Sequence, residues 1–477
     1  MDCMFFNLCG KPELVNDRSI PFMGKALPTP TVYQDAVMML SGALSIYLVA
    51  DLRNLARTGK ATIPLEDLEG PIEIEKVLSH LKDNVETLKA SGDYEDIEEQ
   101  LKALESLKLH NSAGVLSNLL GGSRKSTLLE FGDKDSKKRL VHAITINDSM
   151  KRITVVFRGS VTKNDFITDA KVSQVEVDNP AFKLNEKTSN KTLSLHNGFH
   201  KYLFTHKCPE TDKVRFESIL DSVKELLKKT PGYSVYCTGH SLGAALCTIF
   251  GLFAAADDDI NSLARGPVTV YSVASPYVGD VNFLLAFQSL ERLGKLRHLR
   301  IANAEDIVSL MPVFAPKLGS VIPIVALKDG VMNLYKHCGI KLHLNDLSKR
   351  KIEPVYKLSY PQCQSSDESY ANEISSMLED GKNFLSSMKK ALSKKEQADV
   401  FRYHSCEEYE CRLNACNDDL KSLTLEDLYK NKNIVGETLN EDYVPEMMTS
   451  ASQRISRISN SKYLQNAIKD SLVPKNE

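Results

Sequence analysis

The pentapeptide Gly239-His-Ser-Leu-Gly243 constrains the fold more than any other stretch, because the segments on its two sides differ in character. Residues 233–237 are short, apolar and β-prone, whereas residues 242–256 form an apolar run rich in Ala and Leu. A Gly-x-Ser-x-Gly between a strand and a helix is typical of a sharp turn that exposes the serine hydroxyl. Glycine at 239 and 243 removes side chains that would collide with the neighbouring strand and helix. We therefore predict that Ser241 is a nucleophile at a helix N-terminus, where negative charge is favoured.

Strand-like and helix-like segments alternate on both sides of this turn. Residues 143–146 and 153–157 are predicted to pair as a hairpin before it. After it come strands at 268–273 and 296–301, with a helix around 283–293 between them. Strands joined through helices form a largely parallel sheet. We predict an α/β-hydrolase fold, with a mostly parallel central sheet flanked by helices and a helical insertion near the N-terminus.

Changes in composition and the positions of Pro, Gly and polar stretches divide the chain into segments. We predict an irregular N-terminal segment (1–31), a hydrolase domain (32–50 and 125–416), a charged helical insertion (51–124), an insertion with an amphipathic helix (345–400) and a polar C-terminal tail (417–477). The apolar stretch 36–50 is shorter than the twenty or so residues that span a membrane, and it includes Ser and Gly. A core helix over about 32–57 explains it better.

Charge and cysteine usage exclude several classes. The chain has 60 Lys and Arg against 62 Asp and Glu, so no overall positive field indicates a nucleic-acid partner. Its ten cysteines are scattered, and Cys406 and Cys411 lack the second close pair and the histidines of a zinc site. We expect no metal and no organic cofactor. The N-terminus lacks the basic region of a secretory signal, so a cytoplasmic location is expected.

A serine nucleophile needs a base to take its proton and an acid to orient that base. In α/β-hydrolases the acid follows the serine along the chain and the histidine comes last. Asp306 lies in the loop after the strand 296–301 and is the preferred acid; Glu305 is its rival, and Asp280 is less favoured because it follows the preceding strand.

The histidines after Asp306 are His337, His343 and His404. His343 alternates within an apparent strand at 340–344 and is interpreted as structural. Spacing alone does not decide between His337 and His404.

The anionic intermediate needs donors that are already in place. The backbone N–H of Leu242, the residue after the nucleophile, is one. The second is expected where a strand ends in Arg158-Gly-Ser160, since Gly159 allows a close backbone approach and Ser160 offers both an N–H and a hydroxyl.

Taken together, these motifs resemble the class 3 lipases, the fungal-type triacylglycerol lipase family with its intracellular sn-1 diacylglycerol lipase relatives. The matching pieces are Leu40-Ser-Gly-Ala-Leu-Ser-Ile-Tyr47, Val156-Phe-Arg-Gly-Ser160, Asp165-Phe-Ile-Thr-Asp169, His196-Asn-Gly-Phe199, Thr238-Gly-His-Ser-Leu-Gly-Ala-Ala245, Ala274-Ser-Pro-Tyr-Val-Gly-Asp280, Asn303-Ala-Glu-Asp-Ile-Val308 and Tyr335-Lys-His-Cys-Gly339. They cover roughly 32–50 and 125–410 in the family's order.

The resemblance implies roles for individual residues. It places the acid at Asp306, the oxyanion donor at Ser160 and the base at His404, which precedes a Glu-Glu-Tyr segment, and it treats His337 as structural. It implies a serine hydrolase that cleaves carboxylic esters of glycerolipids, foremost a triacylglycerol or diacylglycerol lipase. The alternatives are a phospholipase or galactolipase acting on polar lipids, and a lipase-like scaffold that binds partners without catalysis.

A water-insoluble substrate also implies contact with a lipid surface. Residues 161–195 occupy the position of the family's lid, and residues 374–395 form a predicted basic amphipathic helix. We expect reversible contact with membranes or lipid droplets.

Overall fold

The computed structural model describes residues 29–90, 126–133, 140–160, 173–184, 190–208, 211–311, 326–328, 331–333, 335–347, 351, 354–361, 402–436 and 438–439. Parts of several predicted segments lie outside these residues. They are most of the N-terminal segment, residues 91–124 of the charged insertion, part of the expected lid, the helix predicted at 374–395 and the end of the C-terminal tail.

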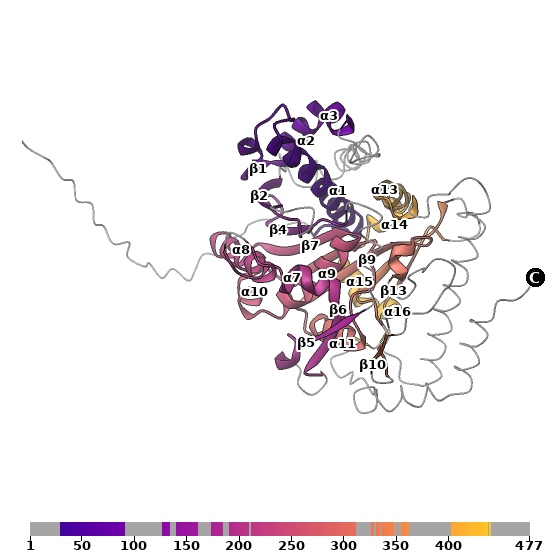
Figure 1. Cartoon of the computed structure of the whole chain (residues 1–477). Coiled ribbons are helices and arrows are strands. Elements are labelled where there is room, and N and C mark those ends of the chain that lie inside the picture. Colours follow the sequence, from indigo (N-terminus) through magenta and orange to yellow (C-terminus); the bar gives the residue numbers. More distant parts are fainter. Residues whose placement is uncertain are drawn as a thin grey trace, which may run out of the picture.

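A central sheet organises the molecule (Figure 1). Its described strands run in the order β1-β2-β3-β4-β7-β8-β9-β12-β13. Their bounds are β1 Ile72–Glu73, β2 Ser126–Gly132, β3 His142–Asn147, β4 Arg152–Phe157, β7 Ser234–His240, β8 Val268–Val273, β9 Leu296–Asn303, β12 Ile340–Leu344 and β13 Tyr356–Ser359. The neighbours from β4 to β12 are parallel, while β1 to β4 and the pair β12–β13 are antiparallel. The predicted α/β fold with a mostly parallel sheet is confirmed.

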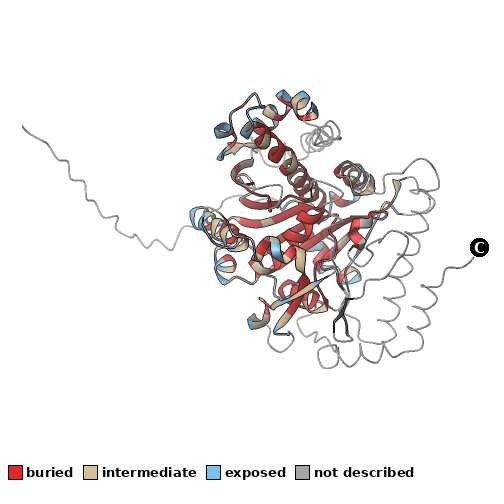
Figure 2. Ribbon diagram, viewed as in Figure 1, coloured by how far each residue is buried: buried red, intermediate tan, exposed pale blue. Residues whose placement is uncertain are grey.

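Helices cover both faces of this sheet. One face packs against α1 (Val32–Arg57), α13 (Cys406–Ala415), α14 (Asn417–Leu420), α15 (Leu425–Lys430) and α16 (Lys432–Val435). The other packs against α7 (Asn197–Phe204), α8 (Arg215–Lys229), α9 (Leu242–Ala255), α10 (Asp258–Leu263) and α11 (Val281–Arg292). Side chains along a strand point alternately to the two faces of the sheet, so one strand contributes to both hydrophobic cores. In β9, Leu299 belongs to the first core and Leu296 to the second. Buried residues accordingly concentrate in the sheet and in α9 (Figure 2).

The helix α1 has the bounds that the sequence predicts. It starts at a capping box, in which the Thr31 side chain accepts from the Gln34 N–H and the Gln34 side chain accepts from the Thr31 N–H. By length and composition it could cross a membrane, but 72% of its most apolar window is buried. Its Asp35 accepts from Arg152 of β4 at 2.6 Å, so it is anchored to the sheet as a core helix.

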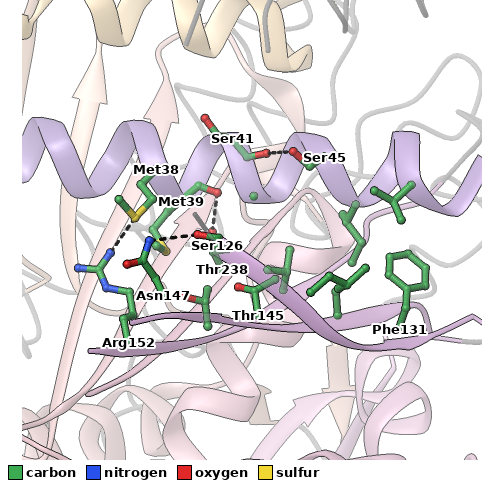
Figure 3. A pocket seen from close by; sticks show the side chains of 17 residues that line it. Met38, Met39, Ser41, Ser45, Ser126, Phe131, Thr145, Asn147, Arg152 and Thr238 are labelled. Atoms are coloured by element: carbon green, nitrogen blue, oxygen red, sulfur yellow. Dashed lines mark hydrogen bonds between the residues drawn. The ribbon is translucent and has the colours of Figure 1, made fainter. Parts of the chain in front are cut away.

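A cavity of about 150 Å³ lies between α1 and the strands β2 to β4 (Figure 3). Gly42 and Ser45 of α1 face Val156 and the other apolar side chains of the sheet across it. Small residues in this part of α1 therefore leave space between the helix and the antiparallel side of the sheet.

We expect Gly42→Ala to stabilise the protein. The new Cβ would lie 3.7 Å from Val156 Cγ2 and 3.8 Å from Thr238 Cγ2, which is ordinary van der Waals contact. Replacing glycine by alanine inside a helix contributes about 1 kcal/mol, which corresponds to an upward shift of about 1–2 °C in the thermal unfolding midpoint. Gly251→Ala in α9 is the control, because its Cβ would meet Val270 Cγ2 at 2.3 Å and should lower the midpoint. A lower midpoint for Gly42→Ala would contradict this account of the cavity.

Two of the segments defined by composition contain short helices that pack on the domain. Residues 417–436, expected as part of a polar tail, form α14 to α16 and bury Leu420, Leu428 and Val435 against the sheet. Because this segment is rich in charged residues, its composition does not reveal the few apolar residues that are buried. In the charged insertion, α2 (Ile74–Asp83) and α3 (Val85–Ala90) pack on α1 through apolar side chains that are 1% exposed or less, those of Val77, Leu81 and Leu88.

The described part of the expected lid is a hairpin of β5 (Gln174–Asp178) and β6 (Thr192–His196). Val175 and Val177 pack against the core on the α9 side, and Ala181 is fully buried. This part is therefore built into the domain. A second hairpin, β10 (Ala326–Lys328) and β11 (Val331–Asn333), completes the described strands.

Candidate active site

Ser241 stands on the sharp turn between β7 and α9. Its φ of 60° and ψ of −125° place a non-glycine residue in a strained backbone region, and its N–H donates to the Val273 carbonyl at 3.0 Å. A Cβ on Gly239 would lie 2.3 Å from the Gly243 carbonyl oxygen, and one on Gly243 would lie 2.1 Å from that of Phe157. Both glycines are therefore required sterically, as the sequence predicts.

The loop after β4 packs directly against this turn. A Cβ on Gly159 would lie 2.6 Å from the His240 carbonyl oxygen and 3.1 Å from the Ser241 Cβ. Ser160 follows Gly159 in the chain, and Leu242 is the first residue of α9. The structure thus places the backbone segments that contain Ser160 and Leu242, the two predicted oxyanion donors, at the nucleophile turn. Ser241 itself is 5% exposed.

Asp306 and His404 lie against each other although 98 residues separate them. Asp306 follows β9 and caps a short 3-10 helix, while His404 ends another just before α13. The His404 Nδ1 is 3.1 Å and 3.0 Å from the two carboxylate oxygens of Asp306. The Asp306 side chain is fully buried, so the pairing takes place away from bulk water.

Further groups fix the Asp306 carboxylate. The Val308 N–H donates to Oδ1 at 2.9 Å, and the Tyr409 hydroxyl donates to Oδ2 at 2.7 Å. The Asn303 N–H in turn donates to the Tyr409 hydroxyl at 3.0 Å. Burial raises the pKa of the Tyr409 phenol well above its usual range, so it stays a hydrogen-bond donor. Sequence reasoning assigned Tyr409 no role; the signal was its position five residues after His404.

The rival acids have other partners. Glu305 pairs with Arg412 of α13 at 2.7 Å. Asp280 caps α11, accepting from the Phe283 N–H at 3.0 Å and from the Ser194 N–H at 3.1 Å. Asp306 is the carboxylate whose oxygens lie within hydrogen-bond distance of the His404 Nδ1.

The rival histidines lie elsewhere. The His337 ring stacks on Tyr277 with centroids 3.8 Å apart, and its Nε2 donates to the Ser309 carbonyl at 2.8 Å. Burial lowers its pKa well below the usual range. His343 lies on β12, as predicted, and burial lowers its pKa to about 3. Both environments suit neutral structural histidines.

The arrangement contains the groups that nucleophilic acyl transfer requires. A strained serine at a helix N-terminus, a histidine held by a buried carboxylate and a backbone loop for the oxyanion are its parts. Among the described residues, no cluster of three or more His, Cys, Asp or Glu side chains could hold a metal ion.

A mostly parallel sheet with a Gly-x-Ser-x-Gly turn, and with acid and histidine following in that order, defines an α/β-hydrolase. Residues 154–315 match the family model of the class 3 lipases.

The chain aligns with somewhat less than half of the length of two plant relatives. Phospholipase A1-II 6 of Oryza sativa subsp. japonica is 32% identical over 180 residues, 35% of this chain and 42% of that protein. The chloroplastic galactolipase DONGLE of Arabidopsis thaliana is 28% identical over 240 residues, 45% of this chain and 46% of that protein. A solved triacylglycerol lipase from Penicillium expansum is 17% identical, covers 55% of this chain and 86% of its own, and has a TM-score of 0.36, too low to bear on function.

Proposed function

We propose that this protein hydrolyses carboxylic esters of glycerolipids through an acyl-enzyme on Ser241. The observation that carries the proposal is the pairing of His404 with the buried Asp306. His240, the residue before Ser241, connects this pair to the nucleophile turn. The centroids of the His240 and His404 rings are 4.6 Å apart.

Each group has one chemical task in this reaction. Ser241 Oγ attacks the ester carbonyl carbon while His404 Nε2 takes its proton, and the same nitrogen returns the proton to the departing alcohol. Asp306 accepts a hydrogen bond from the Nδ1–H of His404 and stabilises the imidazolium that forms. The N–H of Leu242 and the donors of Ser160 meet the negative oxygen of the tetrahedral intermediate. A water molecule, activated by His404, then attacks the acyl-enzyme in the same way and releases the fatty acid.

For the substrate, we propose a polar glycerolipid, a phospholipid or a galactolipid, ahead of triacylglycerol. The support is that the plant relatives above are named a phospholipase A1 and a galactolipase. Diacylglycerol and triacylglycerol, which the motif resemblance placed first, stay candidates because this choice rests on relatives aligned over less than half of their length.

A lipid panel tests the proposal. Purified full-length protein and its Ser241→Ala variant are incubated with vesicles or emulsions of phosphatidylcholine, monogalactosyldiacylglycerol, diacylglycerol and triacylglycerol, and released fatty acid is measured. We expect release from the polar lipids that Ser241→Ala abolishes. Release only from neutral lipids would overturn the substrate choice. A wild-type protein that cleaves none of these and no short-chain ester would favour the non-catalytic scaffold.

We expect Ser160→Ala to lower kcat about 10²–10³-fold with little effect on folding, since one oxyanion donor contributes about 3–4 kcal/mol to the transition state. The side chain is only partly buried, so its loss leaves no cavity in the core. Steady-state kinetics on a p-nitrophenyl ester, with circular dichroism for the fold, measures both. An unchanged kcat would remove the Ser160 hydroxyl from the oxyanion site.

We also propose that the protein works in the cytoplasm and docks reversibly on membranes or lipid droplets. The support is the basic amphipathic pattern at 374–395, which lies outside the described residues, with each lysine contributing about 1 kcal/mol near an anionic surface. In liposome flotation, binding should weaken with salt and with Lys389, Lys390, Lys394 and Lys395 changed to Glu. Binding insensitive to both would place the contact elsewhere.

A further inference from the structure

His240, the variable residue of the Gly-x-Ser-x-Gly turn, makes contacts that the acyl-transfer scheme does not use. Its Nε2 lies 2.8 Å from the backbone carbonyl oxygen of His404, and its Nδ1 lies 3.4 Å from the Tyr47 hydroxyl. The side chain is buried, and the residue is 6% exposed. It therefore joins the end of β7 to the segment that carries His404.

These contacts fix the protonation pattern of the ring. A carbonyl oxygen can only accept, so Nε2 carries the proton and Nδ1 accepts from Tyr47. Burial lowers the pKa of His240 to about 3, with the nearby His404 acting in the same direction, so the ring is neutral. A neutral ring suits this place, because a charged one would repel the imidazolium that forms on His404 during acylation.

The His404 segment is held from two strands of the sheet, β7 and β9, which lie on either side of β8. The Asn303 Nδ2 at the end of β9 donates to the Tyr403 carbonyl at 2.8 Å, and His240 at the end of β7 donates to the next carbonyl. Asp306 then fixes the ring through Nδ1. Backbone and ring of His404 are thus anchored separately, and His240 supplies the anchor nearest to Ser241.

We propose that His240 is a positioning residue that holds the backbone of His404, through its Nε2–H donor, at the place from which the imidazole reaches Ser241. This inference rests on the proposed hydrolase function. It explains why a buried imidazole stands beside the nucleophile, where an apolar residue would avoid the cost of burying polar nitrogens. Tyr47 of α1 aids it by accepting from the Gly159 N–H and by contacting Nδ1, which ties the oxyanion loop to the same histidine.

A pair of amide variants isolates the donor. In His240→Gln the amide nitrogen can stand near the place of Nε2, whereas in His240→Asn the shorter amide cannot reach the His404 carbonyl. His240→Leu removes both polar atoms at similar volume. We expect Asn and Leu to lower kcat on a p-nitrophenyl ester about 10–100-fold with KM within about twofold, because small misplacements of a catalytic group cost about that much. Gln should recover most of the rate.

Two further measurements separate positioning from general loss of structure. His298→Leu is the matched control, since His298 of β9 is also buried, has its pKa lowered by burial to about 3 and forms a hydrogen bond of 2.7 Å with Ser272 of the neighbouring strand β8. It should lower the unfolding midpoint but leave kcat within about threefold. The low-field proton resonance of the His404–Asp306 hydrogen bond should shift or broaden in His240→Asn and stay near its wild-type position in His240→Gln.

Several results would overturn the inference. They are wild-type kcat in both Asn and Leu, equal losses in Gln and Asn, or an equal loss in His298→Leu. If His240→Leu fails to fold, the Gln and Asn pair decides. A wild-type protein without esterase activity would instead defeat the proposed function, and the proton resonance would still report whether His240 positions His404.

Discussion

Replacing Ser241 or His404 by alanine is expected to lower kcat by about 10⁴-fold or more, because the nucleophile, base and acid act as a unit. Ser241→Ala removes the atom that forms the acyl-enzyme. His404→Ala removes the proposed base and its contact with Asp306. Initial rates on a short-chain p-nitrophenyl ester measure both, with the double variant expected to lose no more than either single one.

His337→Ala is the control for the base. Its ring contacts Tyr277 and the Ser309 carbonyl rather than Asp306, so its loss should act on stability more than on kcat. An inactive but folded His337→Ala beside an active His404→Ala would show that the base is misassigned.

Asp306→Asn should lower kcat by about 10⁴-fold with the fold intact. The amide has nearly the same shape, but its NH₂ would face either the Tyr409 hydroxyl or the His404 Nδ1, and it carries no charge to stabilise the imidazolium. The His404 ring is then favoured in the wrong tautomer. Kinetics on the same ester, with KM as the internal check, measures the effect.

Glu305→Gln is the matched control for this change. Glu305 is the residue before Asp306 in the same loop, and its half-buried carboxylate pairs with Arg412. We expect kcat within a few-fold of wild type. Equal losses in the two variants would indicate a loop disturbance and not a catalytic carboxylate.

The core of the fold was predictable because its signals are local. The strand at 268–273, the helix at 32–57 and the strand at 340–344 have the predicted bounds, since each is a continuous apolar or periodic run. Other elements have weak signals in their own sequence. β2 and β13 lie near the sheet edges and mix polar with apolar residues, and α14 to α16 are stabilised mainly by burial against the domain.

The candidate site was predictable in part for the same reason. The turn around Ser241 has a local steric requirement, which two glycines reveal. The choice between His337 and His404 depends on which histidine the chain returns to Asp306, and spacing carries no such information. The family resemblance favoured His404, and the structure places that residue against the carboxylate. Tyr409, Asn303 and His240 act through contacts between distant segments, so only three-dimensional structure could reveal them.

Covalent labelling with a p-nitrophenyl alkylphosphonate tests the central claim most directly, because it requires a nucleophile, a base and an oxyanion site together. Intact-mass analysis and peptide mapping follow the reaction of the full chain. We predict one adduct per protein molecule, located on Ser241, absent in Ser241→Ala and formed far more slowly in His404→Ala. A folded wild-type protein that forms no adduct, or one that is labelled on another residue, would contradict the account.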